Sequence, residues 1–144
     1  MAGIRSVNTK PELIVRSGLH ALGFRFRLHD RRLPGKPDLF LPKYRAAIFV
    51  HGCFWHGHNC RLFKLPETRR ELWRDKIDGN RKRDSRVREE LCAAGIRCLV
   101  VWECALRGRA ARGSVIAEAA AWLRSDAKTG EIGGLPDDGP GGLD

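Results

Sequence analysis

The chain has 144 residues, of which 42% are hydrophobic, and this size and apolar content suit one compact domain. It has no apolar run near the roughly 20 residues that a bilayer-spanning helix needs, and no recognisable signal peptide, so we expect a cytoplasmic protein rather than a membrane protein. The formal net charge of +10 favours a polyanionic partner, most often nucleic acid, although a basic, well-solvated surface would have the same composition.

The first third of the chain predicts one helix and three strands. Thr9-Lys10-Pro11-Glu12 is typical of a capping box, and apolar residues at helical spacing predict a helix that ends at Gly23. Alternating or continuously apolar runs then predict strands at 24–28, 38–41 and 46–50. The last of these contains no polar residue and should therefore be central in a sheet.

The rest of the chain adds helix, strand and helix. The charged segment 67–94 favours helix, with Gly79-Asn80 as a candidate break into two helices. Residues 96–102 predict a second buried strand, and residues 114–125 a final amphipathic helix. This order predicts an α/β fold with a central mixed sheet flanked by helices. The domain should span 1–126, and 127–144, rich in Gly, Pro and acid, should be a disordered tail.

The segment 51–60 combines three histidines, two cysteines and two aromatic residues. Cys53, His58 and Cys60 have the character of zinc ligands, and Cys104 is a candidate fourth ligand because it follows the strand expected to lie beside 46–50. A Cys3His set would be a closed, structural site. Alternatively, Cys104 is a core residue and the histidines bind metal transiently. The chain has five cysteines, an odd number, and we expect ligands or core residues rather than disulfides.

Hydrolytic chemistry is a second hypothesis. Asp38 at a strand start and the backbone carbonyl of Val50 are candidate magnesium ligands. His56 is a candidate general base, and Asp84 could orient its imidazole. Other roles stay open, since an Asp after Pro is also common in turns and Glu12 is already explained by the capping box.

The aromatic residues Phe54, Trp55 and Trp73 suggest a surface that stacks on bases or enters between base pairs. The alternative is that the tryptophans pack beneath the histidine-rich segment. Sequence alone does not decide between these two roles.

Several blocks of this sequence resemble the very-short-patch-repair (Vsr) DNA mismatch endonucleases, in one register from about residue 8 to residue 108. The most specific blocks are 51–60 and Trp102-Glu103-Cys104-Ala105-Leu106, and others are Leu33-Pro34-Gly35-Lys36-Pro37-Asp38 and Trp73-Arg74-Asp75-Lys76-Ile77. The resemblance implies a restriction-endonuclease-like core of the PD-(D/E)XK superfamily. It also implies an enzyme that uses magnesium to nick DNA 5′ to the thymine of a T:G mismatch, which arises when 5-methylcytosine deaminates.

The resemblance further implies a role for each matching residue. The structural zinc ligands would be Cys53, His58, Cys60 and Cys104. Asp38 and the Val50 carbonyl would bind magnesium, although the family commonly has Thr at the position of Val50. The remaining roles would be a catalytic base supported by an acid (His56, Asp84), a histidine near the scissile phosphate (His51), a further acid needed for cleavage (Glu12) and an intercalating wedge (Phe54, Trp55, Trp73).

Two rival functions stay open: a Vsr-like restriction or defence nuclease with another DNA target, and a non-catalytic, zinc-stabilised DNA-binding module. With the main hypothesis we expect double-stranded DNA with a T:G mismatch as partner, a monomer, and a functional link to a DNA cytosine methyltransferase and mismatch-repair proteins. The expected location is the bacterial cytoplasm, at the nucleoid when bound to DNA.

Overall fold

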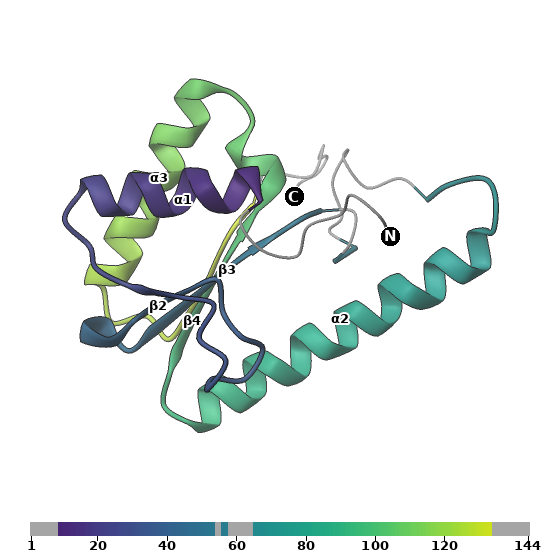
Figure 1. The fold of residues 1–144 in the computed structure, drawn as a ribbon, viewed down its shortest axis with the longest axis horizontal. Helices are drawn as coiled ribbons and strands as arrows, with labels where there is room; N and C mark the ends of the chain where they lie inside the picture. The colour runs from purple at the N-terminus through teal and green to yellow at the C-terminus, as the bar shows by residue number, and fades with distance from the viewer. Residues whose placement is uncertain (1–8, 54–55, 58–64, 134–144) are drawn as a thin grey trace.

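The computed structural model describes residues 9–53, 56–57 and 65–133 of the chain. Within these residues, five strands form one sheet in the order β1-β2-β3-β4-β5 (Figure 1). β1, β2 and β3 pair antiparallel, whereas β3, β4 and β5 are parallel. The sheet is therefore mixed, as the sequence predicts, and its strands are Arg27–Leu28, Leu39–Leu41, Ala46–His51, Arg97–Trp102 and Thr129–Ile132.

Helices cover both faces of this sheet. α1 (Lys10–Ala21) and α3 (Arg109–Arg124) lie on one face, and the long helix α2 (Arg70–Ala93) lies on the other (Figure 1). None of these described helices is both long and apolar enough to cross a membrane. This mixed α/β arrangement fits the restriction-endonuclease-like core expected from the sequence.

Alternation along the strands divides the apolar core into two layers. On β3, Ile48 belongs to the cluster beneath α1 and α3, whereas Phe49 belongs to the cluster beneath α2. On β4, Leu99 and Val100 divide in the same way. β3 is thus buried on both faces, which explains its continuously apolar sequence and confirms that it is a central strand.

The predicted break in the charged helix is wrong. α2 continues without interruption through Gly79 and Asn80. Glycine in an exposed helix interior costs only about 1 kcal/mol relative to alanine. Burial of Ile77 and Leu91 on either side of it gives the helix enough tertiary contact to continue.

The predicted tail also needs correction, because Thr129–Ile132 form β5. This strand pairs with β4 from Cys98↔Thr129 to Val101↔Ile132, and it depends on backbone pairing more than on side-chain pattern. Arg97 holds the connection that leads to it, donating to the carbonyls of Leu123 at 3.0 Å and Ala127 at 2.8 Å. Residues 134–144 lie outside the described residues.

Two predicted boundaries move. The strand expected at 24–28 is paired only at Arg27–Leu28, because its partner β2 has just three residues. The final helix begins at Arg109 rather than at residue 114. Neither shift affects the end of the sheet at which the predicted site residues lie.

Candidate active site

Three strand ends meet at one end of the sheet. Because β2 and β3 pair antiparallel with Leu39 opposite Ile48, the register places Asp38 opposite Phe49, next to Val50. The Val50 N–H donates to Asp38 Oδ2 at 2.7 Å. His29 directly follows β1, and its N–H donates to the Asp38 carbonyl at 3.2 Å. The sheet register therefore brings together residues that are far apart in the sequence.

Glu12 reaches this group from α1. Thr9 Oγ1 accepts from the Glu12 N–H at 3.3 Å, so the predicted N-cap is present. The Glu12 carboxylate lies 3.0 Å from Arg16 Nη1 and 2.8 Å from His29 Nε2, and the residue is 1% exposed. The ligand atoms of Glu12, His29 and Asp38 all lie within 4.8 Å of one another, close enough for one metal ion.

The environment of Asp38 favours a neutral side chain. Burial raises the pKa of Asp38 to about 7, and the adjacent Glu12 carboxylate adds to the rise, while the Val50 N–H and Lys36 oppose it. A carboxyl group with this pKa is about half protonated at neutral pH. A bound cation would favour its ionised form, so the pKa shift and the position of Asp38 both suit a metal ligand.

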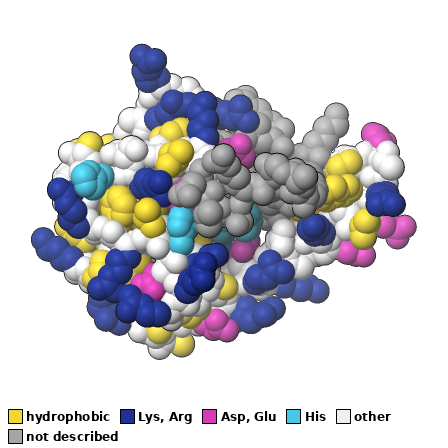
Figure 2. Space-filling model, viewed as in Figure 1, with side chains coloured by type: hydrophobic (Ala, Val, Ile, Leu, Met, Phe, Trp, Pro, Cys, Tyr) yellow, Lys and Arg dark blue, Asp and Glu magenta, His cyan; other side chains and the backbone are white. Residues whose placement is uncertain are grey.

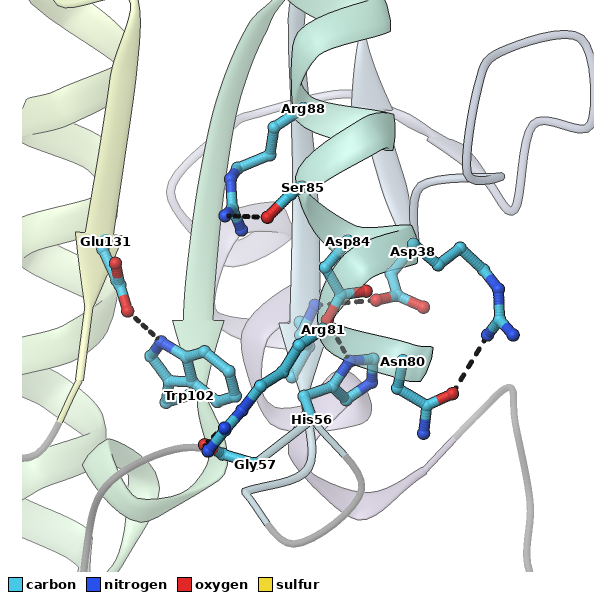
Figure 3. Close-up of polar contacts among 12 residues, drawn as sticks. Asp38, His56, Gly57, Asn80, Arg81, Asp84, Ser85, Arg88, Trp102 and Glu131 are labelled. Carbon is cyan, nitrogen blue, oxygen red and sulfur yellow. Dashed lines mark hydrogen bonds and ion pairs between the residues drawn. The ribbon is translucent and has the colours of Figure 1, made fainter. Parts of the chain in front are cut away.

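A second polar group consists of His51, His56 and Asp84. His56 Nδ1 lies 2.6 Å from Asp84 Oδ2, so α2 supplies the carboxylate that orients this imidazole (Figure 3). The carbonyl of Gly57, the next residue, accepts from Arg81 Nε at 3.1 Å (Figure 3). Two contacts with α2 thus position His56.

His51 lies at the end of β3 and is 7% exposed. Its ring stacks on that of His56, with 3.8 Å between centroids and 5° between planes. Burial, followed by the effect of His56, lowers the pKa of His51 to about 3, so His51 is neutral at physiological pH. Its Nδ1 has no hydrogen-bond partner among the described residues, and a buried polar atom in that state is available to a ligand.

One cavity of about 310 Å³ is lined by His29 and Asp38 of the first group and by all three residues of the second. The same walls carry three cationic side chains, Lys36, Arg83 and Arg88. Three of the residues that line it, Asp38, His56 and Asp84, lie near one another beside α2 (Figure 3). The cavity therefore combines carboxylates, imidazoles and fixed positive charge, which is a suitable set for binding and hydrolysing a phosphodiester.

The predicted zinc ligands are described only in part. Cys53 and Cys104 each lie two residues beyond the paired ends of β3 and β4, His51 and Trp102. They come together there, since the Cys104 N–H donates to Cys53 Sγ at 3.3 Å. The other two predicted ligands, His58 and Cys60, lie outside the described residues.

Of the predicted wedge, Phe54 and Trp55 also lie outside the described residues. Trp73 lies in the first turns of α2 and is half-buried, with Lys76 Nζ 5.9 Å from its ring centroid. The structure does not bring Trp73 into the cavity that holds Asp38 and His56. Its predicted role in DNA binding stays a prediction.

The interpretation of the sequence omitted several residues of the cavity. His29 had no assigned role, although it directly follows a predicted strand that precedes the one begun by Asp38. Lys36, Arg83 and Arg88 belong to segments that read as a turn and a charged helix. Arg88 could have been predicted, because it lies four residues after Asp84 and therefore on the same face of the helix.

Comparison with known proteins is consistent with this geometry. The sequence profile described as DNA mismatch endonuclease Vsr matches residues 1–62. A type II nicking enzyme of Xanthomonas oryzae pv. oryzae, V.XorIIP, is 54% identical over 106 residues, covering 74% of this chain and 78% of that protein. Another type II nicking enzyme, V.NmeAIP of Neisseria meningitidis, is 44% identical over 110 residues, covering 76% and 79%.

A relative from Escherichia coli K12 bears the name DNA mismatch endonuclease Vsr. It is 50% identical to this chain over 109 residues, which cover 76% of this chain and 70% of the relative. Identity at this level extends over most of both chains. The chain belongs to the Vsr family of DNA mismatch endonucleases.

Proposed function

We propose that this protein is a magnesium-dependent endonuclease that nicks one DNA strand 5′ to the thymine of a T:G mismatch. The observation that carries the proposal is the shared cavity, which is lined by Asp38 and by the hydrogen-bonded His56–Asp84 pair. Family membership supports DNA as the substrate class, and the E. coli relative is named for mismatched DNA.

His56 is the proposed general base. With Asp84 accepting from the Nδ1–H, the Nε2 atom of His56 is left as a proton acceptor. A neutral His51 stacked against His56 allows the latter to become positively charged without facing a second cationic ring. Water held near the phosphate would then lose its proton to His56 as it attacks.

The donor set at Asp38 fits a magnesium ion. Asp38 and Glu12 supply carboxylate oxygens in a buried position, and the carbonyl of Val50 is the proposed backbone ligand. Magnesium bound there would polarise the phosphate and stabilise the developing charge. Lys36 and Arg83, on the walls of the cavity, would hold the phosphate from other sides.

A structural zinc ion is proposed at Cys53, His58, Cys60 and Cys104. The support is the contact of Cys53 with Cys104 beyond the ends of two adjacent strands. A thiolate pair in that place would fasten the segment that carries His56 to the end of the sheet. Cys60→Ala should release the zinc and lower stability, as elemental analysis and thermal unfolding would show.

Duplex DNA would approach across the basic face of the molecule. Lys and Arg side chains are spread over the face shown in Figure 2, including the part formed by α2. Phe54, Trp55 and Trp73 are the proposed wedge at the mismatch. A monomer suffices for this reaction, because a nick needs one active site.

The decisive assay compares nicking of a T:G duplex with that of the matched T:A and C:G duplexes, with and without magnesium. We expect magnesium-dependent cleavage of the thymine strand of T:G alone. Equal cutting of matched DNA would contradict the mismatch assignment while leaving the nuclease assignment in place.

A second candidate is a Vsr-like restriction or defence nuclease with a different DNA target, since the relatives V.XorIIP and V.NmeAIP are named type II nicking enzymes and their names mention no mismatch. Duplexes that vary the bases around the T:G pair would separate the two. The non-catalytic DNA-binding module finds no support, because the relatives are named as endonucleases and nicking enzymes, and we expect Asp38→Asn and His56→Ala to abolish nicking.

A further inference from the structure

His29 occupies a position that the proposed mechanism leaves unused. Its Nε2 lies 2.8 Å from Glu12 Oε2, and it forms a group with Glu12 and Asp38 whose ligand atoms are within 4.8 Å of one another. The three residues come from α1, from the end of β1 and from the start of β2. His29 also lines the cavity that contains His56.

The backbone holds His29 in an unusual conformation. Its φ of +50° lies in the left-handed region, which residues other than glycine seldom adopt and which costs about 1 kcal/mol or more. The pairing of the His29 N–H with the Asp38 carbonyl fixes that conformation. Strain of this kind concentrates at functional sites, so the position of the imidazole deserves a chemical explanation.

The acidic side chains around His29 favour the binding of a cation. Glu12 and Asp38 are two acidic groups close together in one poorly exposed site. Arg16 lies 3.0 Å from Glu12 and balances part of this charge from the solvent side of α1. A divalent ion between the two carboxylates would compensate both of them at once.

The donor types decide which ion fits best. Two carboxylates alone would suit magnesium, which prefers oxygen ligands. An imidazole nitrogen shifts the preference toward first-row transition metals, and among these manganese is the one that shares magnesium's preference for carboxylate ligands. To bind a metal, Nε2 must carry no proton, so His29 would bind as the tautomer protonated at Nδ1.

We propose that His29 Nε2 is a protein ligand, beside Glu12 and Asp38, of a divalent cation bound between these three residues, and that this site binds Mn²⁺ in preference to Mg²⁺. This inference rests on the proposed function in one respect, namely that a catalytic cation binds at Asp38. It adds a third side chain to the ligands and changes the expected metal preference.

The test measures metal binding by the DNA-free protein rather than nicking. Mn²⁺ affinity is obtained from the electron paramagnetic resonance signal of free Mn²⁺, and Mg²⁺ affinity from competition against it. We expect His29→Gln to weaken Mn²⁺ binding by roughly tenfold or more, with less than about threefold change for Mg²⁺. Glutamine can still donate to Glu12, so a role limited to holding Glu12 would leave Mn²⁺ affinity unchanged and overturn the proposal.

Three further variants make the result specific. His29→Asn suits the left-handed backbone and repeats the test if His29→Gln fails to fold. His20→Gln, on the exposed side of α1, is the matched control and should bind both ions normally. If His56→Gln abolishes high-affinity Mn²⁺ binding and His29→Gln does not, the cation lies at His51, His56 and Asp84 instead, and the proposal is wrong.

These outcomes are independent of the proposed nicking activity. If the unmodified protein cuts no tested DNA but shows Mn²⁺ binding that depends on His29, the function fails and the metal inference stands. If it nicks T:G DNA and His29→Gln leaves the ratio of Mn²⁺ to Mg²⁺ affinity unchanged, the inference fails and the function stands.

Discussion

The raised pKa of the Asp38 carboxyl group makes the stability of the metal-free protein depend on pH. In the absence of a cation, its folded-state pKa of about 7 lies above the ordinary value of 3.8. The folded protein therefore holds a proton between these two values that the unfolded chain has released. Stability contributed by this proton is present below pH 4 and is lost as the pH rises through 7.

Asp38→Asn should accordingly stabilise the metal-free protein while abolishing nicking. The gain should be near zero at pH 4 and should grow to as much as about 4 kcal/mol at pH 8, since about three pKa units are involved. Thermal unfolding in a chelating buffer at several pH values measures it. Asp78→Asn, on the exposed face of α2, is the control. A gain independent of pH would show that the carboxyl group is not the source.

Asp84 acts through His56, and its replacement should leave the fold intact. Asp84→Asn removes the charge that fixes the Nδ1–H form of His56, whereas the amide retains the size of the side chain. We expect single-turnover nicking to slow by about 10² to 10⁴-fold with little change in DNA affinity. Asp75→Asn on the same helix is the matched control. Equal loss of binding and of rate would instead indicate a role in holding the substrate.

At this scale, the sequence predicted which residue types would act but not all of their partners. Asp38, Val50, His56 and Asp84 were expected to lie together, and the structure brings them to one cavity. His29 was missed because its role depends on β1 pairing with β2 and on a left-handed backbone. Neither feature leaves a hydrophobic or charge pattern in the sequence.

Among the elements, α2 is the one whose continuity matters for the site. It carries Arg81 and Asp84, which contact the segment of His56, and it passes through Gly79 without a break. A Cβ added at Gly79 would have no atom within 4 Å. The glycine is therefore tolerated by the helix rather than required by it.

Gly79→Ala should raise the free energy of unfolding by about 0.5–1 kcal/mol, because alanine is the better helix former. Urea unfolding followed by circular dichroism measures the change, and nicking should be unaffected. A loss of stability would mean that α2 is interrupted at this position in solution.

Gly57→Ala, in contrast, should impair nicking. Gly57 has a φ of +63°, and an added Cβ would lie 2.6 Å from Ile77 and would also clash with Arg81. Alanine would push the segment of His56 away from α2, so nicking should fall by at least about tenfold at unchanged magnesium affinity. Normal activity of this variant would show that the contact of Gly57 with α2 does not position His56.

Strands with a clear apolar pattern were predictable, and those held by backbone pairing were not. The sequence of β3 is apolar because both of its faces are buried, whereas β5 contains Thr, Gly and Glu. β5 is held in place by its parallel pairing with the edge of β4. The five contacts that Arg97 makes with backbone carbonyls support this arrangement. A charged residue in a buried strand is a signal that sequence reasoning could have used.

At the scale of the whole molecule, β5 decides where the folded domain ends. It completes the sheet beside β4, places Ile132 in the main apolar core, and lets Glu131 accept a hydrogen bond from Trp102. These contacts lie beyond residue 126, the predicted end of the domain. Two truncated chains can therefore test where the folded domain ends.

A chain ending after Gly133 keeps the contacts that β5 makes within the described part of the chain, whereas one ending after Asp126 loses the strand and the Arg97–Ala127 hydrogen bond. We expect the first truncation to change stability by less than about 0.5 kcal/mol and the second to lower it by about 2–4 kcal/mol. Urea unfolding of both gives the comparison. If the shorter chain does not fold, Ile132→Ala in the full chain tests the same point, with a loss of about 2 kcal/mol or more expected for this buried side chain. If the two truncations are equally stable, β5 contributes nothing to the stability of the sheet that carries the active site. The folded domain would then end at residue 126, as the sequence predicts.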